Sequence, residues 1–403
     1  MRLVRLSLAD YRNFHRLELD LPGGSSLFLG DNAQGKTNLL EAVYLLATMR
    51  HPRAGSDARL IRWQAVGQPL ASARVATEAE TLAGLLKVEA AIVARQSAGS
   101  GGERGNPGLL ATKVVRVNGV PKRLADAVGQ LTAVLFSPED LDLIGGPPAL
   151  RRRYLDITVS QVDRAYVGAR QRYEKVLGQR NHLLRRLRER LARPDEITFW
   201  NDELVRDGSY IFWARARAVA AVGRLAASLH AELSSGESLR LTYQPCLGRL
   251  HLEDEAPALA EADPGAIADL FAQAQRRHLE REIAAGMTLL GPHRDDLLFL
   301  LGDVPAAGFA SRAQQRTIAL SLRLAEARYL AAERGEPPVL LLDDVLSEMD
   351  ARRRRSLLDA LAGYEQVLIT ATDVEPFSAA FLERASIYGV AGDSVSAGQP
   401  ARP

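Results

Sequence analysis

The sequence predicts an α/β fold, in which the two ends of the chain together form one domain and a helical domain is inserted between them. Alternating or continuous apolar runs, which are typical of strands, occur in residues 1–29 and return in residues 296–301, 339–342 and 366–370. Residues 151–233 instead have the long apolar periodicity of helices. A chain of 403 residues has room for two or three domains, and an insertion is the simplest explanation of the returning strand pattern.

The domain boundaries follow from these changes of pattern. We predict a discontinuous α/β domain in residues 1–155 and 285–403, and an inserted helical arm domain in residues 156–284. The last residues, 391–403, are AGDSVSAGQPARP, and a polar terminus of this kind is predicted to be disordered.

Each element of the α/β domain has its own signal. After the strands of residues 1–29, the apolar segment NLLEAVYLLATM predicts a buried helix at Asn38–Met49. Residues 84–94 and 113–119 predict a strand pair, joined by the glycine-rich segment SAGSGGERGNPG, which is expected to be a surface loop. The run TAVLF predicts a short strand at Thr132–Phe136, which Ser137 and Pro138 end.

The composition bounds the class of protein. With 47% hydrophobic and 25% charged residues, the chain is an ordinary globular one. No apolar run approaches the roughly 18 residues needed to span a bilayer, and the N-terminal residues do not have the pattern of a signal peptide. The single cysteine, Cys246, excludes an internal disulfide and a cysteine-based zinc site. We therefore expect a soluble cytoplasmic protein with no membrane association.

Residues 30–37, GDNAQGKT, have the G-x-x-x-x-G-K-[ST] pattern of a phosphate-binding loop, the P-loop. They lie between the apolar run SSLFL and the predicted helix, where such a loop is expected. Glycines let backbone N–H groups curl around phosphate oxygens, and the helix N-terminus adds its positive end. A glycine-rich turn that ends in Lys-Thr by chance is the alternative, and the strand–loop–helix context disfavours it.

The P-loop pattern predicts roles for the side chains of Lys36 and Thr37. Lys36 is expected to reach the β- and γ-phosphates of ATP, and the Thr37 hydroxyl to ligate Mg²⁺. The chain has only five lysines but 46 arginines, so a lysine here suggests chemistry that arginine cannot supply. The predicted ATP-binding residues are Gly30, Asp31, Asn32, Ala33, Gln34, Gly35, Lys36, Thr37 and Asn38.

A second signal is an apolar run, Val339–Leu342, followed by Asp343 and Asp344. Four apolar residues in a row favour a strand buried on both faces of a largely parallel sheet, and acids at its carboxyl end would lie beside the P-loop. Asp343 is expected to hold Mg²⁺, directly or through water, and Asp344 to orient the attacking water. Lys36 and Asp344 are thus the predicted catalytic residues. A strand followed by a solvated acidic turn is the alternative.

A third signal opens a long predicted helix. Ser311 and Gln314 have the S-x-x-Q spacing of a capping box, which by itself is ordinary chemistry for a helix start. A helix N-terminus capped by a serine hydroxyl is also a place to receive a phosphate. Ser311, Ala313 and Gln314 are therefore candidates for a second phosphate contact.

The order of these motifs, with Ser347-Glu348-Met349-Asp350 after the acidic pair, is similar to that of the Walker A, signature, Walker B and D-loop motifs of ABC-type ATPases. More narrowly, the chain resembles the RecF family of bacterial recombination-repair proteins over most of its length. The matching segments are Tyr11-Arg12-Asn13, GKTNLLEAVYLL, FSPEDLDLIGGPPALRRRYLD (Phe136–Asp156), GQRNHLL (Gly178–Leu184), GPHRDDL (Gly291–Leu297), QQRTIALSLRLAE (Gln314–Glu326) and LLDDVLSEMD.

The resemblance implies an ABC-type P-loop ATPase head related to those of SMC proteins, with a helical arm in place of a long coiled coil. It implies an ATP-dependent homodimer, in which Ser311 of one copy reaches the γ-phosphate held by Lys36 of the other, and a D-loop that includes Ser347 and Asp350. It also implies binding of double-stranded DNA near single-strand/double-strand junctions. With RecO and RecR, such a protein assists the loading of RecA onto gaps.

The chain departs from the family pattern in its signature, where Ala313 stands in place of the usual glycine. The glutamine that senses nucleotide in ABC ATPases has no clear counterpart, and Ser137 and Glu139 are the nearest candidates. Asp344 replaces the glutamate of transporter ATPases, in agreement with the family. These features predict at most a weak, DNA-stimulated ATPase, whereas nucleotide binding depends on the intact P-loop.

A basic segment supports the expectation of DNA binding. Residues 151–193 contain thirteen basic and four acidic residues, a net charge of +9, enough to neutralise several phosphates. Within it, Arg185, Arg186 and Arg188 are the candidate DNA contacts. A solvated helix face is the alternative. Aromatic residues are sparse, which favours contacts to the backbone of duplex DNA over stacking on single strands.

Other classes of protein fit less well. In an ABC transporter subunit, the Walker motifs lie much closer together than the 307 residues that separate Lys36 from Asp343. An SMC-like structural protein needs hundreds of residues of heptads, and the sequence has no sustained heptads. The seven histidines lack metal-ligand spacing, which disfavours a metallonuclease.

Overall fold

The computed structural model describes residues 1–53, 55–66, 71–95, 110–247, 256–347 and 349–398. The chain forms two compact units. Unit 1 consists of Met1–Pro138 and Leu330–Pro403, and unit 2 consists of Glu139–Tyr329. The first unit is therefore built from both ends of the chain and the second from its middle.

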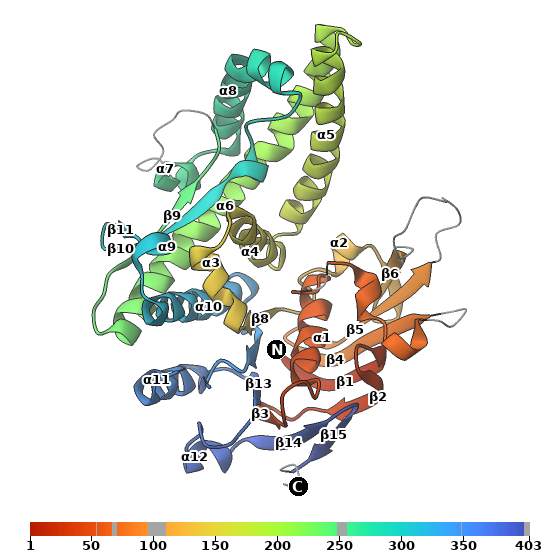
Figure 1. Ribbon diagram of the computed structural model, residues 1–403, viewed down its shortest axis with the longest axis vertical. Coiled ribbons are helices and arrows are strands. Elements are labelled where there is room, and N and C mark those ends of the chain that lie inside the picture. Colours follow the sequence, from red (N-terminus) through yellow and green to blue (C-terminus); the bar gives the residue numbers. More distant parts are fainter. Residues whose placement is uncertain (54, 67–70, 96–109, 248–255, 348, 399–403) are drawn as a thin grey trace. The chain divides into compact units, whose positions relative to one another are not determined.

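The P-loop strand belongs to a six-stranded sheet of unit 1 in which five strands are parallel (Figure 1). Its central strands are buried almost throughout because they are apolar on both faces. In spatial order the six are β15 (Ser394–Ala397), β14 (Ser386–Ala391), β3 (Gly24–Leu29), β13 (Gln366–Ala371), β12 (Val339–Asp343) and β8 (Ala133–Phe136).

The second sheet of unit 1 is antiparallel, and its strands alternate between buried and exposed residues. In spatial order the strands are β2 (Phe14–Asp20), β1 (Arg2–Tyr11), β4 (Ser72–Thr81), β5 (Gly84–Arg95), β6 (Leu110–Val117) and β7 (Val120–Lys122). Helix α1 (Lys36–Thr48) contacts β8, β12 and β13 of the parallel sheet and β4 and β5 of the antiparallel one. Eleven of its 13 residues are buried, so the helix that follows the P-loop is held firmly.

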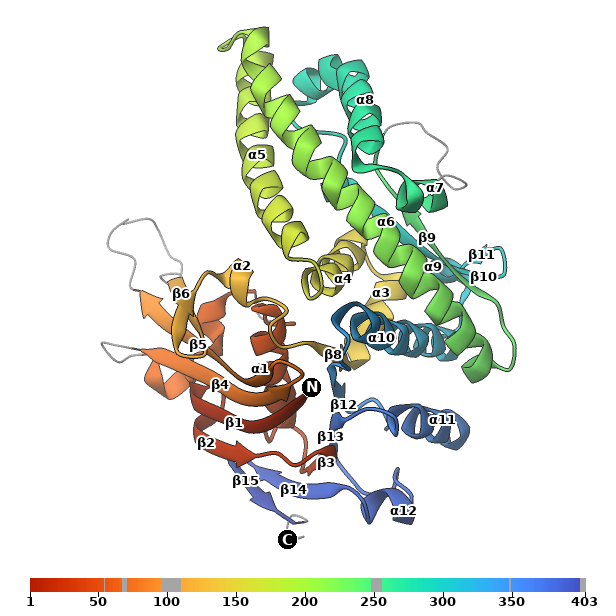
Figure 2. The same cartoon turned by 180° about the vertical axis from the view of Figure 1, so that it is seen from behind.

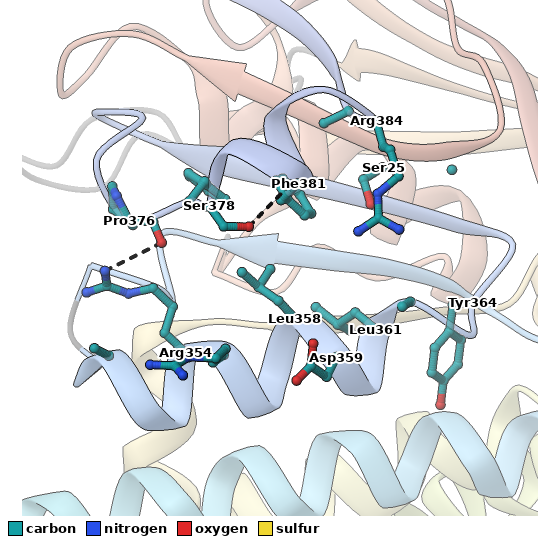
Figure 3. A pocket seen from close by; sticks show the side chains of 16 residues that line it. Ser25, Arg354, Leu358, Asp359, Leu361, Tyr364, Pro376, Ser378, Phe381 and Arg384 are labelled. Carbon is teal, nitrogen blue, oxygen red and sulfur yellow. Dashed lines mark hydrogen bonds between the residues drawn. The ribbon is translucent and has the colours of Figure 1, made fainter.

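The shorter helices of unit 1 are η1 (Asp57–Leu60), η2 (Trp63–Ala65), α2 (Leu124–Ala127), α11 (Ala351–Leu361) and α12 (Ala379–Leu382). Between α11 and α12 lies a pocket of about 420 Å³ (Figure 3). Arg354 donates a hydrogen bond across it to the Pro376 carbonyl (3.4 Å). Gly24 and Ser25 also line the pocket and begin β3, whereas the P-loop follows the other end of that strand. The pocket is therefore separate from the P-loop.

Unit 2 is mainly helical. Helices α5, α6 and α8 pack side by side in both views (Figures 1 and 2). The helices of this middle segment are η3 (Pro138–Asp140), α3 (Leu141–Gly145), α4 (Pro148–Ser160), α5 (Arg164–Arg188), η4 (Pro194–Ile197), α6 (Thr198–Ser234), α7 (Ala256–Glu261), α8 (Pro264–Ala285), η5 (Pro292–Arg294), α9 (Ala306–Phe309) and α10 (Arg312–Arg334), the last of which crosses the boundary between the units. A small antiparallel sheet completes unit 2, with strands β9 (Leu239–Gln244), β10 (Asp296–Leu301) and β11 (Val304–Pro305).

A buried ion pair joins helices α5 and α8 of unit 2. Arg180 of α5 and Glu282 of α8 are fully buried and pair at 2.5 Å. Arg180 also donates to Asn201 and Thr288, at 2.9 and 2.8 Å, so its guanidinium is well satisfied. A buried charge without such partners would be strongly destabilising.

The observed elements agree closely with the predicted strands and helices, but the terminus differs. Residues Ser394–Ala397 form β15, paired antiparallel with β14, so the prediction of disorder from residue 391 is wrong for these residues. The pairing supplies backbone hydrogen bonds that polar composition alone does not reveal. Residues 399–403 and the glycine-rich segment 97–108 lie outside the described residues.

The division into units does not coincide with the predicted domain boundaries. Unit 2 begins at Glu139 and ends at Tyr329, so it includes α4 and the start of the signature helix α10. The arm domain of residues 156–284 remains a prediction. No helix in the described part of the chain is long and apolar enough to cross a membrane.

Candidate nucleotide-binding site

The P-loop joins β3 to α1 and needs unusual backbone conformations to do so. Ala33 and Gly35 both have positive φ, 65° and 98°. A Cβ on Gly35 would overlap the side-chain amide of Asn13, and one on Gly30 would overlap the carbonyl of Val390. Glycine is therefore required at both positions, and the loop keeps the curl that presents backbone N–H groups to phosphate.

Asn13 supports the loop from the side. Its amide nitrogen donates to the Gly392 carbonyl (2.5 Å) and more weakly to the Gln34 carbonyl (3.4 Å), and its oxygen accepts from Asn38 (2.7 Å). Gln34 in turn accepts a hydrogen bond from the Gly392 backbone N–H at 2.7 Å. The turn between β14 and β15 thus helps to hold the P-loop. In sequence, Asn13 belongs to a segment that resembles the family, but nothing there predicted this role.

Lys36 is the first residue of α1, at the end of the loop, and is buried, with 7% of its surface exposed. Its ammonium group donates to the carbonyls of Gly30 (2.5 Å) and Asp31 (2.9 Å). Burial lowers the pKa of Lys36, and the nearby carboxylates of Asp344, Asp343 and Asp31 oppose that shift. A buried cation surrounded by the loop backbone is well placed to bind phosphate oxygens.

Asp343 ends β12 and receives hydrogen bonds from three directions. Its Oδ1 accepts from the hydroxyls of Thr37 (2.6 Å) and Thr370 (3.0 Å), and its Oδ2 accepts from Arg53 (3.0 Å). Thr370 lies on the neighbouring strand, directly opposite Asp343 in the register of β12 and β13. The structure therefore brings together Thr37 and Asp343, the two residues predicted to hold Mg²⁺.

Arg53 links this carboxylate to a second buried one. Its guanidinium also lies 3.3 Å from Glu41, a residue of α1 that is only 2% exposed. Glu41 pairs further with His51 at 2.9 Å. Arg53 and Thr370 were not predicted as site residues. Arg53 could not be predicted from the sequence because one more arginine in an arginine-rich chain does not indicate a site. Thr370 could not be predicted because threonine is an ordinary residue in a strand.

Asp344 and the D-loop follow Asp343. Asp344 has φ 52°, in the left-handed region, and its backbone N–H donates to the Thr370 hydroxyl (3.0 Å). The Ser347 hydroxyl donates to the Asp344 carbonyl (2.8 Å). Asp350 caps α11 by accepting from the Arg353 backbone N–H (2.9 Å), and this contact lowers the pKa of Asp350. These bonds define a compact turn after Walker B.

The signature begins in unit 2 and forms the reciprocal capping box that its spacing predicts. The Gln314 N–H donates to the Ser311 hydroxyl (3.3 Å), and the Ser311 N–H donates to the Gln314 side-chain oxygen (3.0 Å). Ala313 is the second residue of α10 and has no positive φ. Its carbonyl accepts a hydrogen bond from the side-chain hydroxyl of Thr317, one turn further along α10 (3.0 Å).

The predicted DNA contacts lie in the last turn of α5. Arg185, Arg186 and Arg188 are all exposed. Arg186 donates to the Leu191 carbonyl (2.8 Å) and Arg188 to the Ala285 carbonyl (3.5 Å). These contacts engage carbonyls near helix ends, where cations are favourable, and leave the side chains accessible.

The residues around the P-loop fit magnesium and a nucleotide. Thr37 and Asp343 offer two hard oxygen donors 2.6 Å apart, the ligand type that Mg²⁺ prefers. Gly30 and Gly35 let the loop pack closely against Val390 and Asn13, where a Cβ would clash, and so preserve its curled backbone. Lys36 supplies the positive charge for phosphate oxygens.

Comparisons with known proteins identify the family of this chain. A family model described as RecF/RecN/SMC N terminal domain matches residues 2–394. A protein of Chloroflexus aurantiacus, named DNA replication and repair protein RecF, is 44% identical over 408 residues, which cover 99% of this chain and all of the relative. The chain belongs to the RecF family. A RecF of Herpetosiphon aurantiacus is 42% identical over 392 residues, which cover 95% of this chain and 96% of the relative.

Solved structures with a similar fold agree with the family membership. The structure of the recombination mediator protein RecF-ATP in the RecFOR pathway matches with a TM-score of 0.82 and 28% identity, over 98% of this chain and 97% of that one. An Smc head bound to the C-winged helix domain of ScpA matches with a TM-score of 0.52 and 13% identity, over 100% and 98% of the two chains. At that identity the likeness concerns the fold alone. The fold of this RecF-family chain is that of an ABC-type ATPase head.

Proposed function

We propose that this protein is an ATP-gated DNA-binding clamp of recombinational DNA repair. It binds Mg·ATP in unit 1, dimerises on ATP, and holds duplex DNA near single-strand/double-strand junctions. It assists the loading of RecA together with RecO and RecR, and slow hydrolysis of ATP resets it. The names of its relatives, DNA replication and repair protein RecF, support this proposal.

One observation carries the nucleotide part of the proposal. The Thr37 hydroxyl and the Asp343 carboxylate, 306 residues apart in sequence, share a hydrogen bond of 2.6 Å. A P-loop threonine and a Walker B aspartate placed together are the protein ligands that P-loop ATPases use for Mg²⁺. A glycine-rich turn or a solvated acidic turn would have no need of this pairing. The similarity to the RecF-ATP structure, which covers 98% of this chain, supports the binding of ATP.

The position of each residue around the P-loop determines its proposed role in ATP binding and hydrolysis. Lys36 binds the β- and γ-phosphate oxygens, and the loop N–H groups bind the remaining phosphate oxygens. Thr37 and Asp343 would hold Mg²⁺, and the bound ion would offset the negative charge of the phosphates. Thr370 orients the Asp343 carboxylate, and Asp344 orients the attacking water. The left-handed backbone of Asp344 is held by the bond from its N–H to Thr370.

In the proposed dimer, each copy supplies a signature helix to the nucleotide bound by the other. Ser311, with its hydroxyl at the N-terminus of the 23-residue helix α10, contacts the γ-phosphate held by Lys36 of a second copy. Ala313 and Gln314 support that helix start, and Ser347 and Asp350 contribute through the D-loop. ATP therefore bridges two copies, and its hydrolysis separates them.

The DNA part of the proposal is supported by charge. The +9 segment of residues 151–193 supplies exposed arginines, including Arg185, Arg186 and Arg188, for backbone phosphates. Contacts of this kind carry no base information, so binding is insensitive to sequence.

Binding of a fluorescent gapped duplex to the full chain, with ATP, with ADP and without nucleotide, tests the proposal. We expect ATP with Mg²⁺ to tighten binding at least about tenfold, roughly 1.4 kcal/mol. A fully single-stranded oligonucleotide serves as the control and should bind more weakly than the gapped duplex. Equal affinity in all three nucleotide states would reject ATP gating, and no measurable binding would reject the DNA-binding function.

A further inference from the structure

The pocket between α11 and α12 in unit 1 has no part in the proposed function (Figure 3). Its volume of about 420 Å³ lies within the range of roughly 300 to 1,000 Å³ that is typical of ligand pockets. It is lined by residues of α11, of α12 and its flanking segments, and of the start of β3. The P-loop follows the opposite end of β3, so a molecule in this pocket can bind without displacing ATP.

The walls of the pocket are largely apolar. Leu358 and Leu361 lie on the side of α11 that faces α12 (Figure 3). Phe377 and Phe381 line the other side, and their rings stack with centroids 5.1 Å apart. Leu361 and Phe377 are buried, whereas Leu358 and Phe381 are only half-buried. None of the four residues of α12, which have the sequence AAFL, is buried. A partly exposed apolar surface with a polar rim is a feature of protein–protein interaction sites.

Three arginines of the lining form such a rim, and they keep their charge. Arg354 donates to two backbone carbonyls, at 2.9 and 3.4 Å, and Arg384 donates to one, at 3.0 Å. Arg355 is exposed. In the part of the chain that the structure describes, none of these three arginines pairs with a carboxylate. Their guanidinium groups are therefore available to an acidic ligand.

The charge of the lining as a whole is positive. Arg354, Arg355 and Arg384 outnumber Asp359, the one acid among the described lining residues, and the sum is +2. Arg353, the next residue of α11, is different because Asp350 pairs with it at 2.9 Å and it does not line the pocket. Guanidinium groups bind carboxylates through paired hydrogen bonds. The combination of apolar walls and arginines thus favours a ligand that is both apolar and acidic.

We infer that this pocket is the docking site for an acidic, apolar segment of a partner protein. A bulky apolar side chain of that segment fills the space between Leu358 and Phe381, and acidic residues beside it pair with Arg355 and Arg384. Apolar anchors and arginines of this kind supply much of the affinity of protein interfaces. Duplex DNA carries phosphates but no bulky apolar side chain, so the lining favours a protein segment over DNA.

Selection of random dodecapeptides, displayed on phage, for binding to the full chain tests the inference. The library is first depleted on the double variant Arg355→Glu/Arg384→Glu, so that peptides which do not need these arginines are removed. We expect the selected peptides to share a bulky apolar residue flanked by acidic residues. A fluorescein-labelled copy of the most enriched peptide then serves as the probe, and its binding is measured by fluorescence anisotropy.

The double variant should bind this probe at least about tenfold more weakly, because it places like charges opposite the acids of the peptide. Phe381→Ala should weaken binding as well, because it removes part of the apolar wall. Asp359→Asn removes the repelling carboxylate and should tighten binding, a gain that a loss of folding cannot produce. Arg352→Glu changes an exposed arginine of α11 outside the lining and is the matched control, which should bind like the unmodified chain.

ATP affinity should be the same in all of these variants, because the pocket is separate from the P-loop. Absence of acidic, apolar peptides from the selected set would overturn the inference, and so would equal affinity of the probe for the double variant and Arg352→Glu. Loss of duplex binding in the double variant, without any selected acidic peptide, would assign the arginines to DNA and reject the protein segment. Self-association of the unmodified chain without nucleotide, if the double variant abolishes it, would assign the pocket to a second copy and likewise overturn the inference.

Discussion

The Thr37 hydroxyl donates a 2.6 Å hydrogen bond to Oδ1 of Asp343, and so joins the P-loop to the Walker B strand. The bond is possible because β3 and β12 lie on either side of β13 in a parallel sheet, with their carboxyl ends at one edge. Ligands bind at this edge in α/β sheets. Thr370 of β13 lies between the two strands and contacts Asp343 as well.

Asp344→Asn should leave Mg·ATP binding intact, because Asp343 and Thr37 are unchanged, but slow ATP hydrolysis at least roughly 100-fold by removing the charge that polarises the water. Asparagine tolerates the φ of 52° at this position better than other non-glycine residues. Phosphate release and nucleotide binding are measured together. The trapped dimer should also hold duplex DNA longer, and unchanged DNA dissociation would show that hydrolysis does not control release.

The control for that substitution is Asp344→Ala. It removes the same carboxylate but places alanine in the left-handed region, at a cost of about 1 kcal/mol in unfolding free energy. We expect it to hydrolyse ATP as slowly as Asp344→Asn and to melt earlier.

Thr370→Val should raise the Mg²⁺ concentration needed for half-maximal ATP binding by about tenfold, the usual effect of removing a residue that orients a metal ligand. The Thr370 hydroxyl both donates to Asp343 and accepts from the Asp344 N–H, and valine of similar shape does neither. Thr370→Ser keeps the hydroxyl and should need no more Mg²⁺ than the unmodified chain. Identical Mg²⁺ dependence of the valine and serine variants would remove Thr370 from the site.

Charge reversal of Arg185, Arg186 and Arg188 should weaken duplex binding for every DNA sequence. It should also reduce the slope of log binding constant against log salt concentration by up to about 0.9 for each phosphate that is no longer neutralised. The measurement is the duplex dissociation constant as a function of salt. Reversal of Arg224, Arg276 and Arg277, three exposed arginines of the same unit, changes the net charge equally and serves as the control. A salt slope that is the same in both triple variants would mean that the α5 arginines form only a solvated face.

Ala313→Gly should leave ATP affinity unchanged and alter dimer affinity by less than about tenfold, or 1.4 kcal/mol. Ala313 has an ordinary helical backbone, so glycine offers no needed conformation and costs up to about 1 kcal/mol of helix stability. Titration of dimer affinity with and without ATP checks this. A larger gain in dimerisation or hydrolysis would show that the methyl group weakens the signature.

Local patterns predicted much of this fold and part of its site. The four apolar residues before Asp343 form the buried strand β12, and the spacing of Ser311 and Gln314 forms the reciprocal capping box. The capping box is predictable because its interactions are short-range, and β12 because a continuous apolar run is typical of a strand buried on both faces. The P-loop strand and helix were predictable from their apolar runs and the loop motif between them.

The residues that were missed reach the site through the tertiary fold. Thr370 contacts Asp343 only because β13 pairs with β12, and Asn13 contacts the P-loop from a turn between β1 and β2. Arg53 is recognised as a site residue only because the fold brings its guanidinium between the buried carboxylates of Glu41 and Asp343. The error at Ser394–Ala397 has the same origin, because β15 is ordered by pairing with β14 rather than by its own composition.

Sedimentation velocity of the full chain, with and without Mg·ATP, tests the ATP-gated dimer most directly. We expect a monomer without nucleotide and with ADP, and a doubling of mass with Mg·ATP that duplex DNA strengthens. Lys36→Met should stay monomeric in ATP, because it lacks the principal cation on the β- and γ-phosphates. A dimer that forms equally without ATP, or that persists unchanged in Lys36→Met, would contradict the clamp.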